Sequence, residues 1–268
     1  MGLMSGKKGI IMGVANDKSL AWGVAQKLAE QDAQMVFSYQ SEIIRKRVEP
    51  LAQSIGDVEL IECDVAEDAS VKSLLQKFHE KYGSIDFLVH SIAFSDKKEL
   101  TGKYFNTSRG NFLNAMDISC YSFTSLCRHA LDYLADNASI LTFTYLGAER
   151  VMPNYNVMGV IKAALEASVK YLAVDLGDRN IRVNGLSAGP VKTLAASGID
   201  DFRYILKWNQ YNSPLRRNTT LEDIGGAALF LLSDLSSGVT GEIVHVDSGY
   251  HVVGMKAVDA PDINAADA

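Results

Sequence analysis

The stretch Lys8–Gly23, KGIIMGVANDKSLAWG, decides the fold, because a short apolar run passes through a glycine turn into a helical pattern. The run Lys8–Ala15 is continuously apolar and does not alternate, which is typical of a strand buried on both faces of a parallel sheet. The pattern after Ser19 predicts a helix over Leu20–Gln31. A strand that turns through glycine into a helix is how dinucleotide-binding α/β sheets begin.

The same alternation continues along the rest of the chain. Further strands are predicted at Gln34–Tyr39, Val58–Asp64, Ile85–Ser91, Ser139–Thr144, Ile181–Leu186 and Ile243–Val246. Further helices are predicted at Ile43–Ser54, Ser70–Lys81, Phe112–Leu134 and Tyr155–Leu176. This order predicts an α/β fold with a single doubly wound (Rossmann-type) parallel sheet of about seven strands, right-handed crossovers and helices on both faces.

The domain organisation that we expect is simple. Residues 1–255 form one dinucleotide-binding and catalytic domain, and residues 256–268 form a disordered acidic tail. The connection from Ala188 to Gly241 is too long for a plain loop, so it carries its own helices, among them a substrate-binding flap near 190–212. A later helix opens at Thr220, with acidic residues in its first turn.

Composition excludes several classes of protein. The chain has 268 residues, 47% of them apolar, which is enough for one large core. Its 26 basic and 32 acidic residues give a net charge of −6, which disfavours binding to nucleic acid or to an anionic membrane. Three cysteines and five scattered histidines match neither a disulfide framework nor a metal site. The first apolar run is too short for a signal peptide, so we expect a cytoplasmic protein.

The first turn has residues that suit a pyrophosphate. Gly13 permits a tight turn where a β-carbon would crowd a phosphate, and Ser19 places a hydroxyl and an amide at a helix start, where the dipole favours anions. Leu20 opens the helix, and Gly23 lets it lie close to the sheet. The spacing departs from G-x-G-x-x-G, and an ordinary strand–turn–helix with a serine cap explains it equally well.

Later strand ends carry further candidate contacts for a dinucleotide. Gln40 lies where a carboxylate normally holds the adenosine ribose, and no cation at 40 or 41 is placed for a 2′-phosphate, which favours NADH over NADPH. Arg45 keeps NADPH as an alternative. Asp64 is an acceptor for the adenine amino group, or equally a turn carboxylate. The other candidate contacts at these strand ends are Val65, Ser91, Ile92 and Ala93.

A tyrosine and a lysine form the candidate catalytic pair. Tyr155 and Lys162 are seven residues apart in a predicted helix, nearly two turns, so both side chains project from one face. An ammonium beside a phenol favours the phenolate and strengthens the phenol as a donor. Such pairs are common on ordinary helices, but this helix follows a strand that ends in Tyr145. Two phenols and an ammonium near a nicotinamide form an electrophilic pocket for an oxygen that gains negative charge.

The end of the sixth predicted strand adds the remaining contacts. We expect Val191 and Thr193 to meet the nicotinamide amide and the pyrophosphate. The segment Leu194–Ile199 that follows is small and apolar. It suits a mobile flap over an apolar substrate, or a helix packed on the core.

Taken together, these segments resemble the bacterial enoyl-acyl carrier protein reductases of type II fatty acid synthesis, within the short-chain dehydrogenase/reductase superfamily. The similarity runs from about Lys7 to Met255. Other members of the superfamily have the lysine four residues after the tyrosine, where this chain has Gly159, so the longer spacing is specific. The matching segments are Gly13…Ser19…Gly23, Ser91–Ala93, Tyr145–Arg150, Pro153–Gly159 with Lys162, and Ser187–Pro190 with Thr193–Ile199.

The resemblance implies hydride transfer from NADH to C3 of a trans-2-enoyl thioester, followed by protonation of the enolate at C2. It implies that Tyr155 donates to the thioester and enolate oxygen and that Lys162 holds the nicotinamide ribose hydroxyls. Tyr145 lines the acyl pocket. The other implied acyl-pocket residues are Ala93, Ala195, Ala196, Ile199 and Phe202, together with Tyr155 itself.

The implied partners are an acyl carrier protein and further copies of the chain in a homotetramer. An acidic carrier needs a basic dock, yet Ile199 is followed by Asp200 and Asp201. The cations that follow form a candidate patch, or simply a solvated charged face: Arg203, Lys207, Arg216 and Arg217.

Two other functions remain open. One is a 3-oxoacyl or ketone reductase of the same superfamily, which normally has a serine about a dozen residues before the tyrosine, where this chain has Phe143, Thr144 and Tyr145. The other is a non-catalytic NAD-sensing module. A sensor needs neither the pair of Tyr155 and Lys162 nor a flap, so their presence favours an enzyme.

Overall fold

A computed structural model describes residues 1–194, 196 and 199–263. Within them, seven parallel strands form one sheet in the order β3-β2-β1-β4-β5-β6-β7. The order reverses between β1 and β4, which in such sheets is where ligands bind. The strands are β1 (Lys8–Met12), β2 (Gln34–Tyr39), β3 (Glu59–Glu62), β4 (Ile85–His90), β5 (Leu134–Thr144), β6 (Arg182–Ala188) and β7 (Ile243–Val246).

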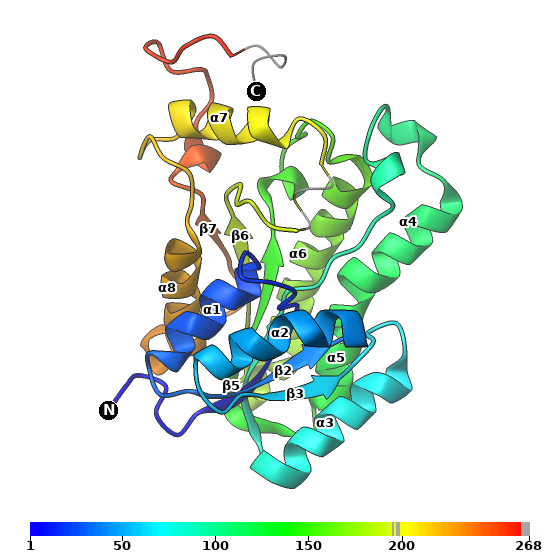
Figure 1. The fold of residues 1–268 in the computed structure, drawn as a ribbon, viewed down its shortest axis with the longest axis vertical. Coiled ribbons are helices and arrows are strands. Elements are labelled where there is room, and N and C mark those ends of the chain that lie inside the picture. The colour runs from blue at the N-terminus through cyan, green and yellow to red at the C-terminus, as the bar shows by residue number, and fades with distance from the viewer. Residues whose placement is uncertain (195, 197–198, 264–268) are drawn as a thin grey trace.

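Helices cover both faces of the sheet (Figure 1). The α-helices are α1 (Leu20–Ala29), α2 (Glu42–Ser54), α3 (Asp68–Tyr82), α4 (Arg109–Met116), α5 (Ser122–Ala130), α6 (Asn156–Leu176), α7 (Phe202–Asn212) and α8 (Leu221–Leu232). A π-helical turn, η3 (Asp117–Tyr121), joins α4 to α5. The short 3-10 helices are η1 (Lys97–Glu99), η2 (Tyr104–Asn106), η4 (Leu146–Ala148), η5 (Gly177–Arg179), η7 (Asp234–Ser236) and η8 (Tyr250–Val252).

The core has two layers, one on each face of the sheet. Helices α3, α5 and α6 pack on one face, against strand residues such as Ile10 and Ile140. Helices α1, α2 and α8 pack on the other face, against the alternate residues Ile11 and Leu141. Because successive strand residues point to opposite faces, both must be apolar, which explains the continuous apolar runs in the sequence. The predicted doubly wound sheet is confirmed.

The sequence located most elements within a few residues, with one clear error. The predicted helix Phe112–Leu134 is wrong as a single element, because η3 interrupts it and α5 ends at Ala130. Leu134 already belongs to β5 and pairs with Ile85, ahead of an irregular register before Ser139. A π turn keeps a helix-like apolar spacing, so the sequence pattern shows no break there.

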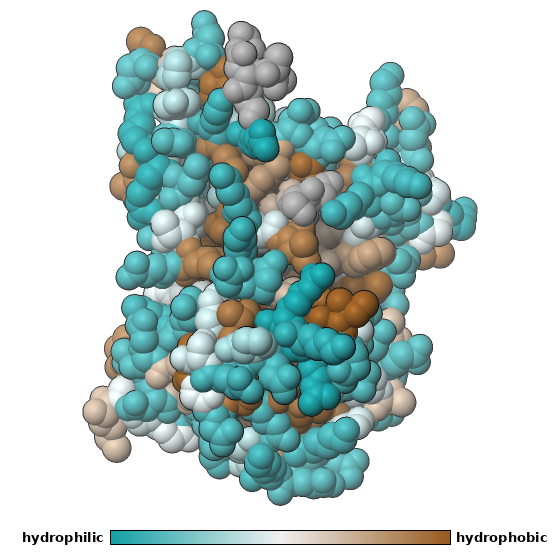
Figure 2. Space-filling model, viewed as in Figure 1, coloured by the Kyte–Doolittle hydropathy of each residue, from teal (hydrophilic) through white to brown (hydrophobic). Residues whose placement is uncertain are grey.

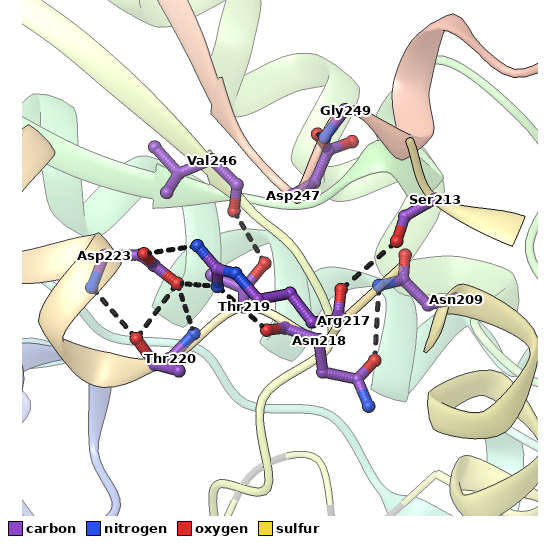
Figure 3. Close-up of polar contacts among 10 residues, drawn as sticks. All are labelled: Asn209, Ser213, Arg217, Asn218, Thr219, Thr220, Asp223, Val246, Asp247 and Gly249. Atoms are coloured by element: carbon purple, nitrogen blue, oxygen red, sulfur yellow. Dashed lines mark hydrogen bonds and ion pairs between the residues drawn. The ribbon is translucent and has the colours of Figure 1, made fainter. Parts of the chain in front are cut away.

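The long connection after β6 carries α7 and α8, as predicted. Helix α8 begins after Thr220, whose hydroxyl accepts from the amide of Asp223 while the Asp223 carboxylate accepts from the amide of Thr220 (Figure 3). This capping box is why the helix starts where the sequence indicated. Helix α7 lies at the top of the molecule in Figure 1, over the carboxyl ends of the strands.

Part of the predicted tail is described. The amide of Ala257 donates to Asn212 Oδ1 at 2.8 Å, and Arg216 Nη2 pairs with Asp259 Oδ1 at 2.8 Å. Residues up to 263 therefore run along the end of α7. The remainder of the predicted disordered tail, 264–268, lies outside the described residues. None of the described helices is both long enough and apolar enough to cross a membrane.

Candidate active site

A single cavity of about 1280 Å³ opens at the carboxyl ends of the strands. Figure 2 shows apolar surface in the middle of this face with hydrophilic surface on either side. Every predicted site residue that the structure describes lines this cavity, from the first turn to the flap. These residues are Gly13, Ser19, Leu20, Gln40, Asp64, Val65, Ser91, Ile92, Ala93, Tyr145, Tyr155, Lys162, Val191, Thr193, Ala196, Ile199 and Phe202.

The turn after β1 leaves no room for a side chain at its glycine. Gly13 has φ +96°, and a β-carbon there would lie 2.0 Å from the carbonyl oxygen of Ser91. The hydroxyl of Ser19 accepts from the amides of Ala15 (3.0 Å) and Asn16 (3.1 Å), so it holds the turn together. The first amides of α1, beginning with Leu20, have no partner within the helix. They supply the positive end of the dipole at the cavity wall.

The far end of the cavity brings two predicted residues into contact. Gln40 Nε2 donates to Asp64 Oδ2 at 3.1 Å, so the ends of β2 and β3 present one joined polar site. Arg45 is held by Glu42 at 3.1 Å and Glu49 at 3.9 Å on its own helix. This arrangement neutralises the cation that kept NADPH as an alternative, and it favours a ribose without a 2′-phosphate.

Tyr155 and Lys162 both reach the same cavity from α6. Tyr155 is the N-cap residue of the helix and not its first turn, and Lys162 is 6% exposed. The Lys162 ammonium donates to the carbonyl oxygen of Phe143 at 2.7 Å. The rings of Tyr145 and Tyr155 meet edge to face with centroids 5.0 Å apart. Within the described part of the chain, no residue hydrogen-bonds the Tyr155 hydroxyl, so it is available to an oxygen in the cavity.

Burial dominates the protonation of this pair. It raises the pKa of Tyr155 well above its usual range, with smaller contributions from Tyr145 and Glu166. It lowers the pKa of Lys162 to about 8, against the opposing effects of Cys120 and Glu166. The expected lowering of the phenol pKa by the ammonium does not appear, because the loss of solvation is the larger effect. Tyr155 is therefore a neutral proton donor.

Two glycines fix the position of the Tyr155 ring. A β-carbon on Gly147 would lie 2.3 Å from Cδ1 of Tyr155. A β-carbon on Gly159 would lie 2.7 Å from the carbonyl oxygen of Gly147. Position 159 is where other members of the superfamily have their lysine, so this close packing leaves no space for that arrangement. The lysine has to come from the next turn of α6.

Replacing Gly147 by alanine is expected to lower kcat by roughly tenfold to a hundredfold, because the new methyl group displaces the Tyr155 ring. Steady-state kinetics with the folded variant measure it. Gly226→Ala in α8 is the matched control, since no atom lies within 4 Å of the β-carbon added there. A Gly147→Ala enzyme with full kcat would show that the ring position does not matter.

Two asparagines beside Tyr155 connect it to both sides of the cavity mouth. Asn154 Nδ2 donates to the carbonyl oxygen of Asp200 (3.1 Å) and to Asp201 Oδ2 (3.2 Å), just before α7. Asn156 Nδ2 donates to the carbonyl oxygens of Leu100 (2.8 Å) and Gly102 (3.2 Å), in the loop after β4. Both asparagines have positive φ, at 55° and 37°. The tyrosine thus lies between two tethered rims.

The flap residues lie on the cavity side. Ala196 is buried, and its amide donates to Thr193 Oγ1 at 3.0 Å. Ile199 packs against the core, and Phe202 opens α7. The predicted acyl-pocket residue Ala195 lies outside the described residues.

Some lining residues were missed in the sequence. The loop after β4 contributes Phe94, Lys97 and Lys98 to the cavity, and α6 contributes Met158. The loop follows the predicted strand end directly, and the carboxyl ends of parallel strands share one edge, so its place was available from topology. Its charged residues gave no pattern that distinguishes a cavity mouth from ordinary surface.

Comparisons with known proteins agree with this geometry. A family model described as "Enoyl-(Acyl carrier protein) reductase" matches residues 13–251. The chain is 64% identical over 263 residues to "Enoyl-[acyl-carrier-protein] reductase [NADH] 1" of Rhizobium meliloti (strain 1021), covering 98% of this chain and 97% of the relative.

Solved structures show the same fold. The enoyl-(acyl carrier protein) reductase of Anaplasma phagocytophilum in complex with NAD superposes with a TM-score of 0.93 at 61% identity, over 98% of both chains. The Bacillus cereus enoyl-acyl carrier protein reductase with NADP+ and indole naphthyridinone also has a TM-score of 0.93, at 47% identity, over 95% of this chain and 100% of that one.

Proposed function

The chain belongs to the enoyl-(acyl carrier protein) reductase family, and we propose that it reduces trans-2-enoyl thioesters carried on acyl carrier protein to saturated acyl thioesters with NADH. The observation that carries the proposal is the meeting of Tyr155 and Lys162 in one cavity with the glycine turn after β1. This is the last reduction of a fatty acid elongation cycle. It saturates a carbon–carbon bond and leaves the thioester intact.

The residues present fit a dinucleotide. The cradle at Gly13 would be filled by any β-carbon, and the dipole of α1 faces the space where a pyrophosphate lies. Gln40 and Asp64 would hold the adenosine, and Val191 and Thr193 the nicotinamide end. When bound, NADH supplies the hydride that goes to C3 of the substrate.

Tyr155 acts on the substrate oxygen. As hydride reaches C3, negative charge develops on the thioester oxygen, and a neutral phenol stabilises it by donating a hydrogen bond. Burial keeps the phenol protonated and makes the donor stronger in its effect, because few waters compete for the oxygen. Tyr145 packs against its ring and limits its rotation.

Lys162 holds the nucleotide and shapes the local field. Its ammonium has one donor on the Phe143 carbonyl oxygen and two further donors for hydroxyls in the cavity, such as those of a ribose. Glu166 lies one turn later on α6 and accepts from Thr144 Oγ1 at 2.7 Å. Consecutive residues of β5 thereby hold consecutive turns of α6, which fixes the direction of the lysine.

NADH affinity is expected to fall as pH rises past about 8, because the free enzyme loses the Lys162 proton there. Below that pH the ammonium is charged and affinity is constant, and above it one donor and one charge are lost. Fluorescence titration of NADH across this range measures Kd. The Lys162→Ala variant should show no such step, and a step retained in that variant would assign the titration to another group.

The structure also bears on the ketone-reductase alternative. Its catalytic serine would lie on β5 about a dozen residues before Tyr155. The hydroxyls available there are engaged, with Thr142 Oγ1 donating to the carbonyl oxygen of His90 and Thr144 Oγ1 to Glu166. Neither is placed to bind a ketone oxygen, which supports the enoyl reaction.

One assay separates the three functions. Purified protein should oxidise NADH with a trans-2-butenoyl thioester, with a lower kcat/KM when NADPH replaces NADH. Turnover only with 3-oxobutanoyl thioesters would mean a ketone reductase. Tight NADH binding without turnover on either substrate would mean a sensor.

We also infer a homotetramer, on the evidence of an uncovered apolar face. Helix α6 exposes Val160, Tyr171 and Val174 along one side, with the last two 77% and 80% exposed. Leu113 of α4 and Tyr121 of η3 expose further apolar surface. Contiguous apolar surface of this kind typically marks an interface between subunits. A cytoplasmic location and closure of the segment near 190–212 over the substrate belong to the same proposal.

The assembly is expected to weaken when a charge enters that face. Tyr171→Glu should shift the protein from tetramer toward smaller species in light scattering coupled to gel filtration. Lys77→Glu on the exposed side of α3 is the control. A monomer for the unaltered chain would refute the inferred tetramer.

A further inference from the structure

The cations that the sequence suggested as a carrier dock are largely neutralised. Arg217 makes two hydrogen bonds to the carboxylate of Asp223, at 2.5 and 2.9 Å (Figure 3). Arg216 pairs with Asp259. Asp200 and Asp201 also stand at the start of α7, on the cavity side. This rim would repel an anionic partner.

The opposite rim has the reverse charge. The loop between β4 and α4, at the upper right of Figure 1, carries Lys97, Lys98 and Lys103, which we call the basic rim. All three lysines are exposed, and none forms an ion pair with any of residues 1–194, 196 or 199–263. Lys97 and Lys98 also line the mouth of the active-site cavity. The cations therefore stand where a substrate on a long arm would enter.

The acidic groups of this loop are turned to the loop itself. Asp96 Oδ1 accepts from the amide of Lys98 at 2.9 Å. The carboxylate of Glu99 accepts from the amide and the hydroxyl of Ser108, both at 2.8 Å. Because both carboxylates are occupied by hydrogen bonds within the loop, they leave the ammonium groups of the basic rim unpaired.

Apolar surface accompanies these charges. Phe105 is 76% exposed, and the Lys103 ammonium lies 5.5 Å from its ring centroid. Phe94 and Tyr104 are about half exposed, at 50% and 46%. Aromatic side chains beside cations are the composition typical of a protein-binding surface, in which the aromatics supply contact area and the charges supply orientation.

The basic rim is also mechanically tied to the catalytic tyrosine. Asn156, the neighbour of Tyr155, donates to the carbonyl oxygens of Leu100 and Gly102, between the lysines of the rim. On the other side, Asn111 of α4 accepts from the amide of Asp96 at 2.9 Å. A partner that binds here therefore contacts a loop anchored beside the reacting phenol.

We propose that the basic rim, and not the start of α7, is the surface on which the acyl carrier protein docks, through an anionic patch around the attachment point of its phosphopantetheine arm. The inference rests on the proposed function, since it names the surface used by the same substrate. The arm then enters the cavity past Lys97 and Lys98, with its thioester directed to Tyr155. The acidic start of α7 excludes the opposite orientation.

Substrates that differ only in their carrier test this. The unaltered enzyme and the Lys97→Glu/Lys98→Glu/Lys103→Glu variant are assayed with trans-2-butenoyl carrier protein, trans-2-butenoyl 4′-phosphopantetheine and trans-2-butenoyl N-acetylcysteamine. The ratio of kcat/KM for the carrier substrate to that for the N-acetylcysteamine substrate is expected to fall on the order of tenfold in the variant, mainly through KM. The salt dependence of the carrier reaction should weaken as well.

Controls decide the alternatives. Lys77→Glu on α3 should leave the ratio unchanged. A ratio that is unchanged in the triple variant, or that falls instead in Lys192→Glu/Arg203→Glu beside α7, would overturn the proposal. So would an equal loss on the 4′-phosphopantetheine substrate, because the lysines would then bind the phosphodiester alone. Absence of turnover with N-acetylcysteamine thioester in the unaltered enzyme would instead contradict the proposed function.

Discussion

The Tyr155→Phe enzyme is expected to lose about 10²- to 10⁴-fold in kcat for the enoyl thioester while its Kd for NADH stays within about twofold. The substitution removes only the hydroxyl, which has no partner among the described residues and faces the cavity. The ring, its edge-to-face contact with Tyr145 and its packing on Gly147 remain. The loss therefore falls on the charge that develops in the transition state. Single-turnover kinetics together with NADH titration measure the two quantities separately.

Tyr145→Phe is the matched control for this prediction. It removes a hydroxyl from the neighbouring ring, and burial likewise raises the pKa of Tyr145, with smaller effects from Tyr250 and Asp247. We expect its kcat to fall much less, because Tyr145 lines the pocket and orients Tyr155. If Tyr145→Phe cost more in kcat than Tyr155→Phe, the roles of the two phenols would be exchanged.

The Lys162→Ala enzyme is expected to bind NADH about 10- to 100-fold more weakly, because it loses charge-assisted hydrogen bonds to the nucleotide. The buried ammonium has a single described hydrogen-bond partner, the Phe143 carbonyl oxygen, so its remaining donors serve the cavity. Isothermal titration or fluorescence gives Kd directly.

Two further variants make the Lys162 result specific. Lys162→Met fills most of the same volume without a charge, so weak binding in this variant is not due to a cavity in the core. Lys170→Ala removes an exposed lysine from the same helix and should bind NADH normally. Normal NADH affinity in Lys162→Met would remove the lysine from the cofactor site.

Much of the fold was predictable because it depends on patterns that the sheet imposes. Strands β2 and β7 begin and end where the apolar runs do, since a strand buried on both faces must be apolar throughout. The cavity lining followed from the same rule, because strand ends of a parallel sheet share one edge. The error in the region 112–134 arose where a π turn preserved the helical spacing.

The charges of the rims were not predictable in the same way. Arg217 and Asp223 are six residues apart and meet only because the turn before α8 folds back. Lys97 and Lys98 looked like ordinary surface until the loop after β4 was placed at the cavity mouth. The fall in the pKa of Lys162 depends on burial by three different elements, which no local pattern encodes.

The absence of lysine at Gly159 was visible in the sequence, but its reason was not. Only the coordinates show that a β-carbon there would meet the Gly147 carbonyl oxygen, next to the Tyr155 ring. The seven-residue spacing is therefore a consequence of close packing between η4 and α6. Spacing and packing together set the distance between the phenol and the ammonium along the helix.

The most direct test of the account follows the hydrogen atoms. The enzyme is supplied with NADH that carries deuterium at the transferred position of the nicotinamide, a trans-2-butenoyl thioester and ordinary water, and the product is examined by NMR. The account predicts a butanoyl thioester with deuterium at C3 and a solvent proton at C2. Deuterium at C2, or a product that keeps its double bond while NADH is consumed, would contradict it.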